Sequence, residues 1–381
     1  MPSSGLFVTL YDEDTLNLYL DRGIYGFLMP PVFGNISSRS RHYAALADYA
    51  CTRRGTHVFF FLKRMIAYGG QITGSKSFGA FYLNGPYSPM GRKANAKVYW
   101  DESKRERYVS TDRPGIFNVP EVGQRCQPYL IIFKDELNLK GRIISSDQLY
   151  FELGKYSYPL PSNSISGMGF CTLTPGETDI ALSLLEKESV ECLPGVSSEK
   201  VNIEGSPIPF DPKYGILSLK EAFGRSLLVN EAHLEASVLA NPDLLPKEVR
   251  PNGATICRQV PVSPFKPFQM GRADICYFKE DCIANGTVPN VVIELKSTQA
   301  GKNAIEQITR YLKWFHIVLG EEASKISVYL LAPSFAVTDK LLPEEYRYQV
   351  KFIGLGNDGH LQKKNCEYLD SALTDDTACL K

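Results

Sequence analysis

The sequence changes its character about halfway along, and this change most constrains the fold. Residues 1–187 contain β-branched and aromatic runs separated by glycine or polar turns, which are typical of short strands. Residues 188–227 are rich in Pro, Gly and Ser and show no sustained period. Residues 228–381 alternate helical and strand patterns. We therefore expect a two-domain α/β (α+β) fold, in which a linker joins a β-rich domain to a C-terminal α/β domain.

Within residues 1–187, five runs are predicted strands and one Ala-rich stretch, 41–49, is a predicted helix. A mostly β domain with one or two small helices is the expected result. The predicted strands cover 56–62, 65–74, 79–85, 128–133 and 142–146.

The C-terminal half has clearer boundaries. Asn230 is the predicted N-cap of a helix over 231–240, and Asn241-Pro242 ends it, because a residue before proline is disfavoured in the α region. A second helix begins near Asn303, has apolar residues at helical spacing and stops at Gly320. Strands are predicted at CRQVPV, GRADICYF, VVIELKS (291–297) and KISVYLLAP (325–333).

Charge, apolar runs and cysteine content argue against a wholly basic protein, a membrane protein and a zinc- or disulfide-stabilised protein. Lys plus Arg and Asp plus Glu both number 42, so the chain is not basic throughout, although a local basic face remains open. No apolar run approaches the roughly 18 residues of a membrane span, and no secretory signal is visible. Nine cysteines without a CxxC pair, with five histidines, indicate neither a zinc knuckle nor a disulfide framework. We expect a soluble, cytoplasmic protein.

Three charged residues on two neighbouring predicted strands form a candidate metal site. Glu294 and Lys296 share one face of VVIELKS, since side chains alternate along a strand. Asp274 lies on the preceding strand and can stand opposite them. Two carboxylates suit Mg²⁺ or Mn²⁺, and the carbonyl of Leu295 could add a third ligand. A salt bridge at a strand end is the alternative, but charges within a buried strand need partners or a metal.

These motifs, GRADI, VVIELK and a helix beginning NAIEQITRY, resemble the PD-(D/E)xK nuclease superfamily, and the nearest branch is the NucS endonuclease catalytic domain. LEASVLANPDLL is similar to the helix that opens that domain. The resemblance covers about a third of the chain, roughly 228–335, and implies Asp274 and Glu294 as metal ligands and Lys296 as the catalytic lysine. It also implies catalytic roles for Gln307 and, less securely because Glu231 lies one turn earlier, for Glu235. Tyr311 lies one turn after Gln307 and is expected at the nucleic acid.

The N-terminal half combines basic and aromatic residues, which suits contact with a nucleic-acid backbone and stacking of a flipped base. The alternative is that the aromatic run FFF is core strand and the arginines are solvated. The pattern faintly resembles PUA-like and EVE-type readers of modified bases, whereas the NucS N-terminal domain is not evident. The candidate nucleic-acid-binding residues are Arg39, Arg41, Arg53, Arg54, Tyr68 and Trp100.

The expected function is that of a Mg²⁺-dependent (or Mn²⁺-dependent) DNA endonuclease of the restriction or defence type, with an N-terminal DNA reader. A NucS-like repair enzyme for mismatches or branched structures is an alternative. A non-catalytic nucleic-acid-binding protein is a second alternative. A homodimer is expected if both strands are cut, because two strands require two active sites.

Overall fold

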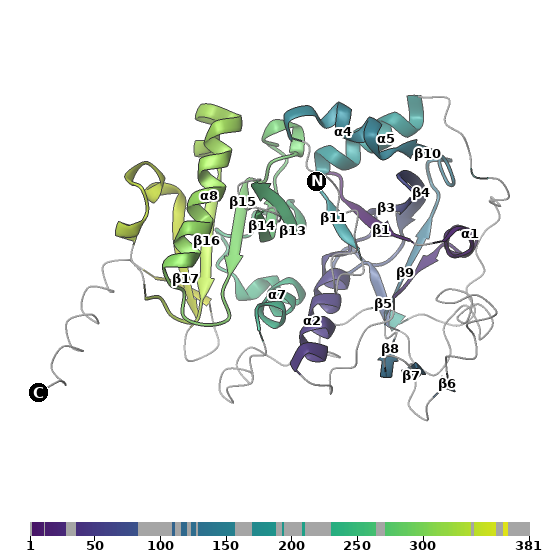
Figure 1. The fold of residues 1–381 in the computed structure, drawn as a ribbon, viewed down its shortest axis with the longest axis horizontal. Coiled ribbons are helices and arrows are strands. Elements are labelled where there is room, and N and C mark those ends of the chain that lie inside the picture. The colour runs from purple at the N-terminus through teal and green to yellow at the C-terminus, as the bar shows by residue number, and fades with distance from the viewer. Residues whose placement is uncertain are drawn as a thin grey trace, which may run out of the picture. The chain divides into compact units, whose positions relative to one another are not determined.

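The computed structural model contains two compact units, which we call the N-terminal unit (Ser3–Ile216) and the C-terminal unit (Leu217–Lys381 with Met1–Pro2). Both combine strands and helices, so the fold is mixed α/β (Figure 1). The predicted linker lies almost entirely outside the described residues, so its boundaries stay predictions. The structure describes residues 2–10, 12–27, 36–82, 109–110, 116–119, 123–126, 129–156, 170–187, 193, 208–209, 230–263, 271–336, 339–355 and 361–364.

The N-terminal unit is built on a sheet with the strand order β11-β1-β3-β4-β9-β5-β12, to which β10 adds beside β4 and β2 beside β9. In the described residues this order is open, and it does not identify the unit with a PUA-like reader. The strands are β1 Gly5–Thr9, β2 Ile24–Tyr25, β3 His57–Leu62, β4 Met65–Ile72, β5 Ala80–Tyr82, β9 Tyr129–Lys134, β10 Ile143–Ser145, β11 Cys171–Leu173 and β12 Ile208–Pro209. A separate small sheet holds β6 Val109–Ser110, β7 Ile116–Val119 and β8 Gly123–Cys126.

The N-terminal unit contains more helix than the sequence patterns predicted. Ser145 and Gln148 form a capping box that starts α4, and Thr174 and Glu177 exchange the same pair of hydrogen bonds at the start of α5. The expectation of one or two small helices was therefore wrong. The helices are α1 Glu13–Arg22, α2 Ile36–Cys51, α4 Ser146–Leu153, the 3₁₀ turn η2 Gly154–Tyr156 and α5 Pro175–Lys187.

Strands β3 and β4 form the apolar centre of the N-terminal unit and are joined by a two-residue turn with positive φ at Lys63 and Arg64. Phe59, Phe60 and Tyr68 are fully buried there. The aromatic run therefore belongs to the core, as the alternative interpretation held.

A buried histidine in β3 predicts a pH-dependent stability for the N-terminal unit. His57 is 8% exposed, and burial lowers its pKa from 6.5 to about 4, while the charge of Asp179 partly opposes this. Because the folded state holds His57 neutral, stability is lost as the pH falls from about 6.5 towards 4, by roughly 3 kcal/mol in total. Thermal melts at pH 7 and pH 5 should show a larger loss for the wild type than for His57→Gln. Equal losses of melting temperature in the two proteins would contradict the assignment of this pH dependence to His57.

The C-terminal unit has a six-stranded sheet in the order β13-β14-β15-β16-β17-β18. Strand β15 lies between antiparallel β14 and parallel β16, which explains its continuous apolar run, since a central strand is covered on both faces. The strands are β13 Thr255–Ser263, β14 Gly271–Phe278, β15 Val291–Leu295, β16 Ser327–Ala332, β17 Val350–Leu355 and β18 Leu361–Lys364.

Two helices of the C-terminal unit pack against this sheet. α7, Glu231–Ala240, begins after the N-cap Asn230, as predicted, and packs on β15. α8, Lys302–Leu319, ends at Gly320 as predicted and packs its apolar stripe on β13 and β14. Short 3₁₀ turns complete the unit: η4 Pro242–Leu244, η5 Ala284–Gly286, η6 Gly320–Lys325, η7 Asp339–Leu341 and η8 Glu344–Gln349.

None of the helices in the described part of the chain is both long enough and apolar enough to cross a membrane.

Candidate active site

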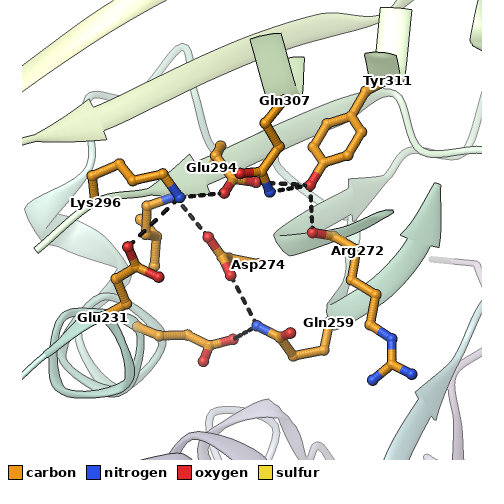
Figure 2. Close-up of polar contacts among 10 residues, drawn as sticks. Glu231, Gln259, Arg272, Asp274, Glu294, Lys296, Gln307 and Tyr311 are labelled. Atoms are coloured by element: carbon orange, nitrogen blue, oxygen red, sulfur yellow. Dashed lines mark hydrogen bonds and ion pairs between the residues drawn. The ribbon is translucent and has the colours of Figure 1, made fainter. Parts of the chain in front are cut away.

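The predicted charged trio converges at one end of the β14–β15 pair (Figure 2). The register places Ile275 of β14 opposite Ile293 of β15, so Asp274 and Glu294 lie next to each other across the two strands. Lys296 follows β15 directly, and its backbone N–H donates to the carbonyl of Leu331 on β16. Glu294 is 2% exposed although it carries a carboxylate. A buried carboxylate beside a second, half-buried carboxylate needs a compensating positive charge.

Both carboxylate oxygens of Asp274 accept a hydrogen bond. The backbone N–H of Leu295 donates to Oδ2 at 2.7 Å, and the side-chain amide of Gln259 donates to Oδ1 at 2.9 Å. Burial raises the pKa of Asp274 well above its ordinary value, and the charges of Glu294 and Glu235 raise it further. The N–H of Leu295 and the charge of Lys296 oppose this only in part. The site thus disfavours a second negative charge unless a cation is present.

Glu294 and Lys296 form a close ion pair. The Nζ atom of Lys296 lies 2.7 Å from Oε1 of Glu294 and 3.6 Å from Oε1 of Glu231. Burial raises the pKa of Glu294 despite this pairing. Burial alone would lower the pKa of Lys296, but the carboxylates around it raise the pKa above its ordinary value. Lys296 is therefore protonated at neutral pH and acts as a hydrogen-bond donor.

Helix α8 contributes the two predicted residues Gln307 and Tyr311. The amide of Gln307 donates to the Tyr311 hydroxyl at 2.5 Å, and this hydroxyl contacts Oε2 of Glu294 at 3.2 Å and the carbonyl of Arg272 at 2.6 Å. Tyr311 is completely buried. The prediction that Tyr311 contacts nucleic acid is therefore corrected: its hydroxyl links α8 to Glu294.

Helix α7 contributes two glutamates with different surroundings. Glu235 is buried and accepts from Arg258 of β13 through both oxygens, at 3.0 Å from Nε and 2.7 Å from Nη2. Glu231, one turn earlier, is half exposed and faces Lys296 (Figure 2). Both oxygens of Glu235 are engaged by Arg258, and its catalytic role stays a prediction. Glu231 takes the place beside the lysine.

The site residues suit a hard divalent cation. Mg²⁺ is usually bound by one or two carboxylates with water completing the octahedron, and the Asp274–Glu294 pair provides this donor set. Among the described residues, no group of three or more His, Cys, Asp or Glu side chains is placed to hold a metal ion. The candidate protein ligands are the two carboxylates of Asp274 and Glu294, which lie across the paired strands β14 and β15. The carbonyl of Leu295, at the end of β15, stays a predicted third ligand.

The N-terminal candidates divide into three groups. Arg53 donates to the carbonyls of Ala50 and Thr52 at the end of α2, so its guanidinium caps a helix. Tyr68 is buried and bonded to His57, so no base can stack on it. The prediction for Tyr68 is corrected, and the DNA contact of Arg53 stays a prediction. Arg41 and Arg54 are exposed, and their role stays a prediction. Trp100 and the side chain of Arg39 lie outside the described residues.

Sequence reasoning missed two residues that touch the site. Gln259 lies on β13 and donates to Asp274, and Arg272 supplies the carbonyl that accepts from Tyr311. Arg272 belongs to the GRADI motif and lies two residues before Asp274, so its strand position could have indicated proximity. Nothing in the sequence around Gln259 marks it as a site residue.

Comparisons with known proteins give two similar solved structures. One is a repair endonuclease from Pyrococcus abyssi, 23% identical, with a TM-score of 0.23; the alignment covers 33% of this chain and 47% of that chain. The other is a complex of EndoMS with double-stranded DNA, 13% identical, with a TM-score of 0.21, covering 87% of this chain and 95% of that one. No protein-family model matches, and no curated protein matches. TM-scores this low do not establish a shared overall fold.

Proposed function

We propose that the C-terminal unit is a divalent-metal-dependent DNA endonuclease that hydrolyses phosphodiester bonds at Asp274, Glu294 and Lys296. One observation carries this proposal: two adjacent carboxylates, Asp274 and Glu294, lie beside the ammonium group of Lys296 at the end of a central strand. Burial raises the pKa of both acids, which agrees with this arrangement. Perturbed acid pairs of this kind are concentrated at functional sites. A structural ion pair would need one carboxylate for one lysine, whereas three carboxylates surround Lys296: Glu294, Glu231 and Asp274.

A bound Mg²⁺ or Mn²⁺ would supply Lewis-acid chemistry towards a phosphate oxygen. Asp274 and Glu294 would hold the cation, and the backbone N–H of Leu295 fixes the orientation of the first of them. Lys296 Nζ donates a hydrogen bond, which suits it to orient a water molecule or to stabilise negative charge on the phosphate. Gln307 acts through Tyr311, because its amide holds the Tyr311 hydroxyl beside Glu294.

The substrates that the enzyme prefers distinguish two classes of DNA endonuclease. A restriction or defence enzyme would discriminate by sequence or base modification, whereas a repair enzyme would discriminate by mismatch or branching. Among the N-terminal candidates that the structure describes, the exposed Arg41 and Arg54 are proposed to contact the DNA backbone, and a base contact by Trp100 stays a prediction. A homodimer is proposed for cutting of both strands, and light scattering of the full chain measures it directly.

The proposal predicts metal-dependent cleavage that requires Lys296. The full chain should cut DNA with Mg²⁺ or Mn²⁺ and not with EDTA, when offered modified, unmodified, mismatched and single-stranded substrates. Lys296→Met should slow cleavage by about 10²- to 10³-fold, because a donor aimed at developing charge is lost. It should still bind Mn²⁺ in calorimetry, because both carboxylates remain.

Lys302→Met is the matched control, since Lys302 is an exposed lysine of α8 that pairs only with Glu306 among the described residues. Cleavage in EDTA, or wild-type rates in the Lys296 variant, would contradict the proposal. Retention of DNA without cutting by the wild type would favour the non-catalytic binding protein.

A further inference from the structure

Gln259 has a backbone conformation that is out of place in a strand. It lies within β13, between Arg258 and Val260, which pair with Ile275 and Ala273 of β14. Its φ is +52°, in the left-handed region that residues other than glycine rarely adopt. Of the non-glycine residues with positive φ in the described chain, Gln259 alone lies inside a strand; the others are Lys63, Arg64, Asn138, Ala284 and Asn285. Strain of this kind persists only where the surroundings enforce it.

The residues that contact the Gln259 side chain enforce this backbone conformation. Its amide nitrogen lies 2.9 Å from Oδ1 of Asp274 and 3.4 Å from Oε1 of Glu235. The same Glu235 is held through both oxygens by Arg258, the neighbour of Gln259 in β13. The polar contacts therefore run without a break from the buried Arg258–Glu235 ion pair through Gln259 to Asp274. Figure 2 shows Gln259 beside Asp274.

The contact determines how Asp274 presents its oxygens. A carboxylate oxygen has two lone pairs, and Gln259 and the N–H of Leu295 each occupy one, on opposite oxygens. The carboxylate is thus fixed at both ends while each oxygen keeps a lone pair for a cation. A neutral amide achieves this without a positive charge, so it does not compete electrostatically with a metal ion as a second lysine would.

We propose that Gln259 is a positioning residue, which holds Asp274 in the orientation that binds the catalytic cation and has its strained backbone conformation for this purpose. This inference rests on the proposed function, because it assumes that Asp274 is a ligand. Partners that orient metal-ligating carboxylates typically contribute 10- to 100-fold to metal affinity or activity.

Gln259→Gly separates this role from a structural one. Glycine adopts positive φ at no steric cost, so the variant removes the amide and relieves the backbone strain together. Its melting temperature in EDTA should equal or exceed that of the wild type. Mn²⁺ should bind about 10- to 100-fold more weakly in calorimetry, and kcat should fall by a similar factor while KM for DNA stays unchanged.

Asn285→Gly is the matched control. Asn285 is exposed, lies in the turn η5 of the same unit and has a φ of +54°, so it tests a change to glycine at a left-handed position without a contact to the site. Its Mn²⁺ affinity and kcat should equal those of the wild type. Wild-type Mn²⁺ affinity and kcat in Gln259→Gly would overturn the proposal, as would losses that accompany a lowered melting temperature. Failure of the wild type itself to bind Mn²⁺ or to cut would refute the nuclease assignment instead.

Discussion

Replacing Glu294 by glutamine is expected to abolish DNA cleavage while leaving the fold intact or more stable. A metal ligand stabilises the transition state by several kcal/mol, so the rate should fall on the order of 10³-fold or more. Burial raises the pKa of Glu294, so the neutral amide is easier to bury than the carboxylate. Melting temperature in EDTA and single-turnover cleavage with Mg²⁺ measure the two effects. This combination is typical of catalytic groups, which sacrifice stability for activity.

Glutamine at position 294 is preferable to asparagine at position 274 for this test. Oε2 of Glu294 faces the Tyr311 hydroxyl, which can accept a hydrogen bond from an amide. Both partners of Asp274 are donors, so asparagine there would set an N–H against an N–H. Glu306→Gln on the exposed side of α8 is the control and should cut at the wild-type rate. Cleavage by Glu294→Gln at the rate of this control would remove Glu294 from the mechanism.

Breaking the buried Glu235–Arg258 pair should produce the largest loss of stability in the C-terminal unit. Their side chains are 4% and 2% exposed, and two hydrogen bonds join them. Removing one partner strands a buried charge, so Glu235→Ala or Arg258→Ala should lower the free energy of unfolding by about 3–5 kcal/mol. Replacing both by apolar residues of similar size, Glu235→Leu with Arg258→Met, should recover most of this loss. Urea denaturation of the wild type, Glu235→Leu, Arg258→Met and the double variant forms a double-mutant cycle.

The variant Glu235→Ala also tests the role of Glu235. If Glu235 acted only as a catalytic carboxylate, cleavage would fall without a loss of stability. The structure predicts instead that stability and cleavage fall together, because the Gln259–Asp274 contact loses its support. Glu231→Gln should leave stability unchanged, because Glu231 is half exposed.

The secondary structure near the site could be predicted because local signals and tertiary packing agree there. Asn230 caps α7, Gly320 ends α8, and the apolar run of β15 indicates a central strand. The missed helices α4 and α5 also had a local signal, the two capping boxes, but strand-like composition around them obscured it. Predicted nucleic-acid contacts failed where they required an exposed side chain. An aromatic residue such as Tyr68 cannot be recognised from the sequence as buried or exposed.

Of the candidate site, the sequence predicted the three charged residues but not the residues that hold them in place. Alternation along β15 places Glu294 and Lys296 on one side, and pairing with β14 adds Asp274. The choice between Glu231 and Glu235 could not be made from sequence, because residues one helical turn apart share a face and the docking of α7 decides which reaches the lysine. A left-handed residue within a strand leaves no sequence pattern, so Gln259 was found only in the structure.

Anomalous scattering from crystals grown with Mn²⁺ tests the proposed metal site without relying on activity. A peak is expected within about 2.5 Å of both the Asp274 and the Glu294 carboxylates, since oxygen donors hold such cations at about 2.0–2.6 Å. Crystals of Glu294→Gln under the same conditions should lose this peak. Well-ordered wild-type carboxylates without a peak between them at millimolar Mn²⁺, with Lys296 still bonded to Glu294, would contradict the assignment of a metal-dependent nuclease.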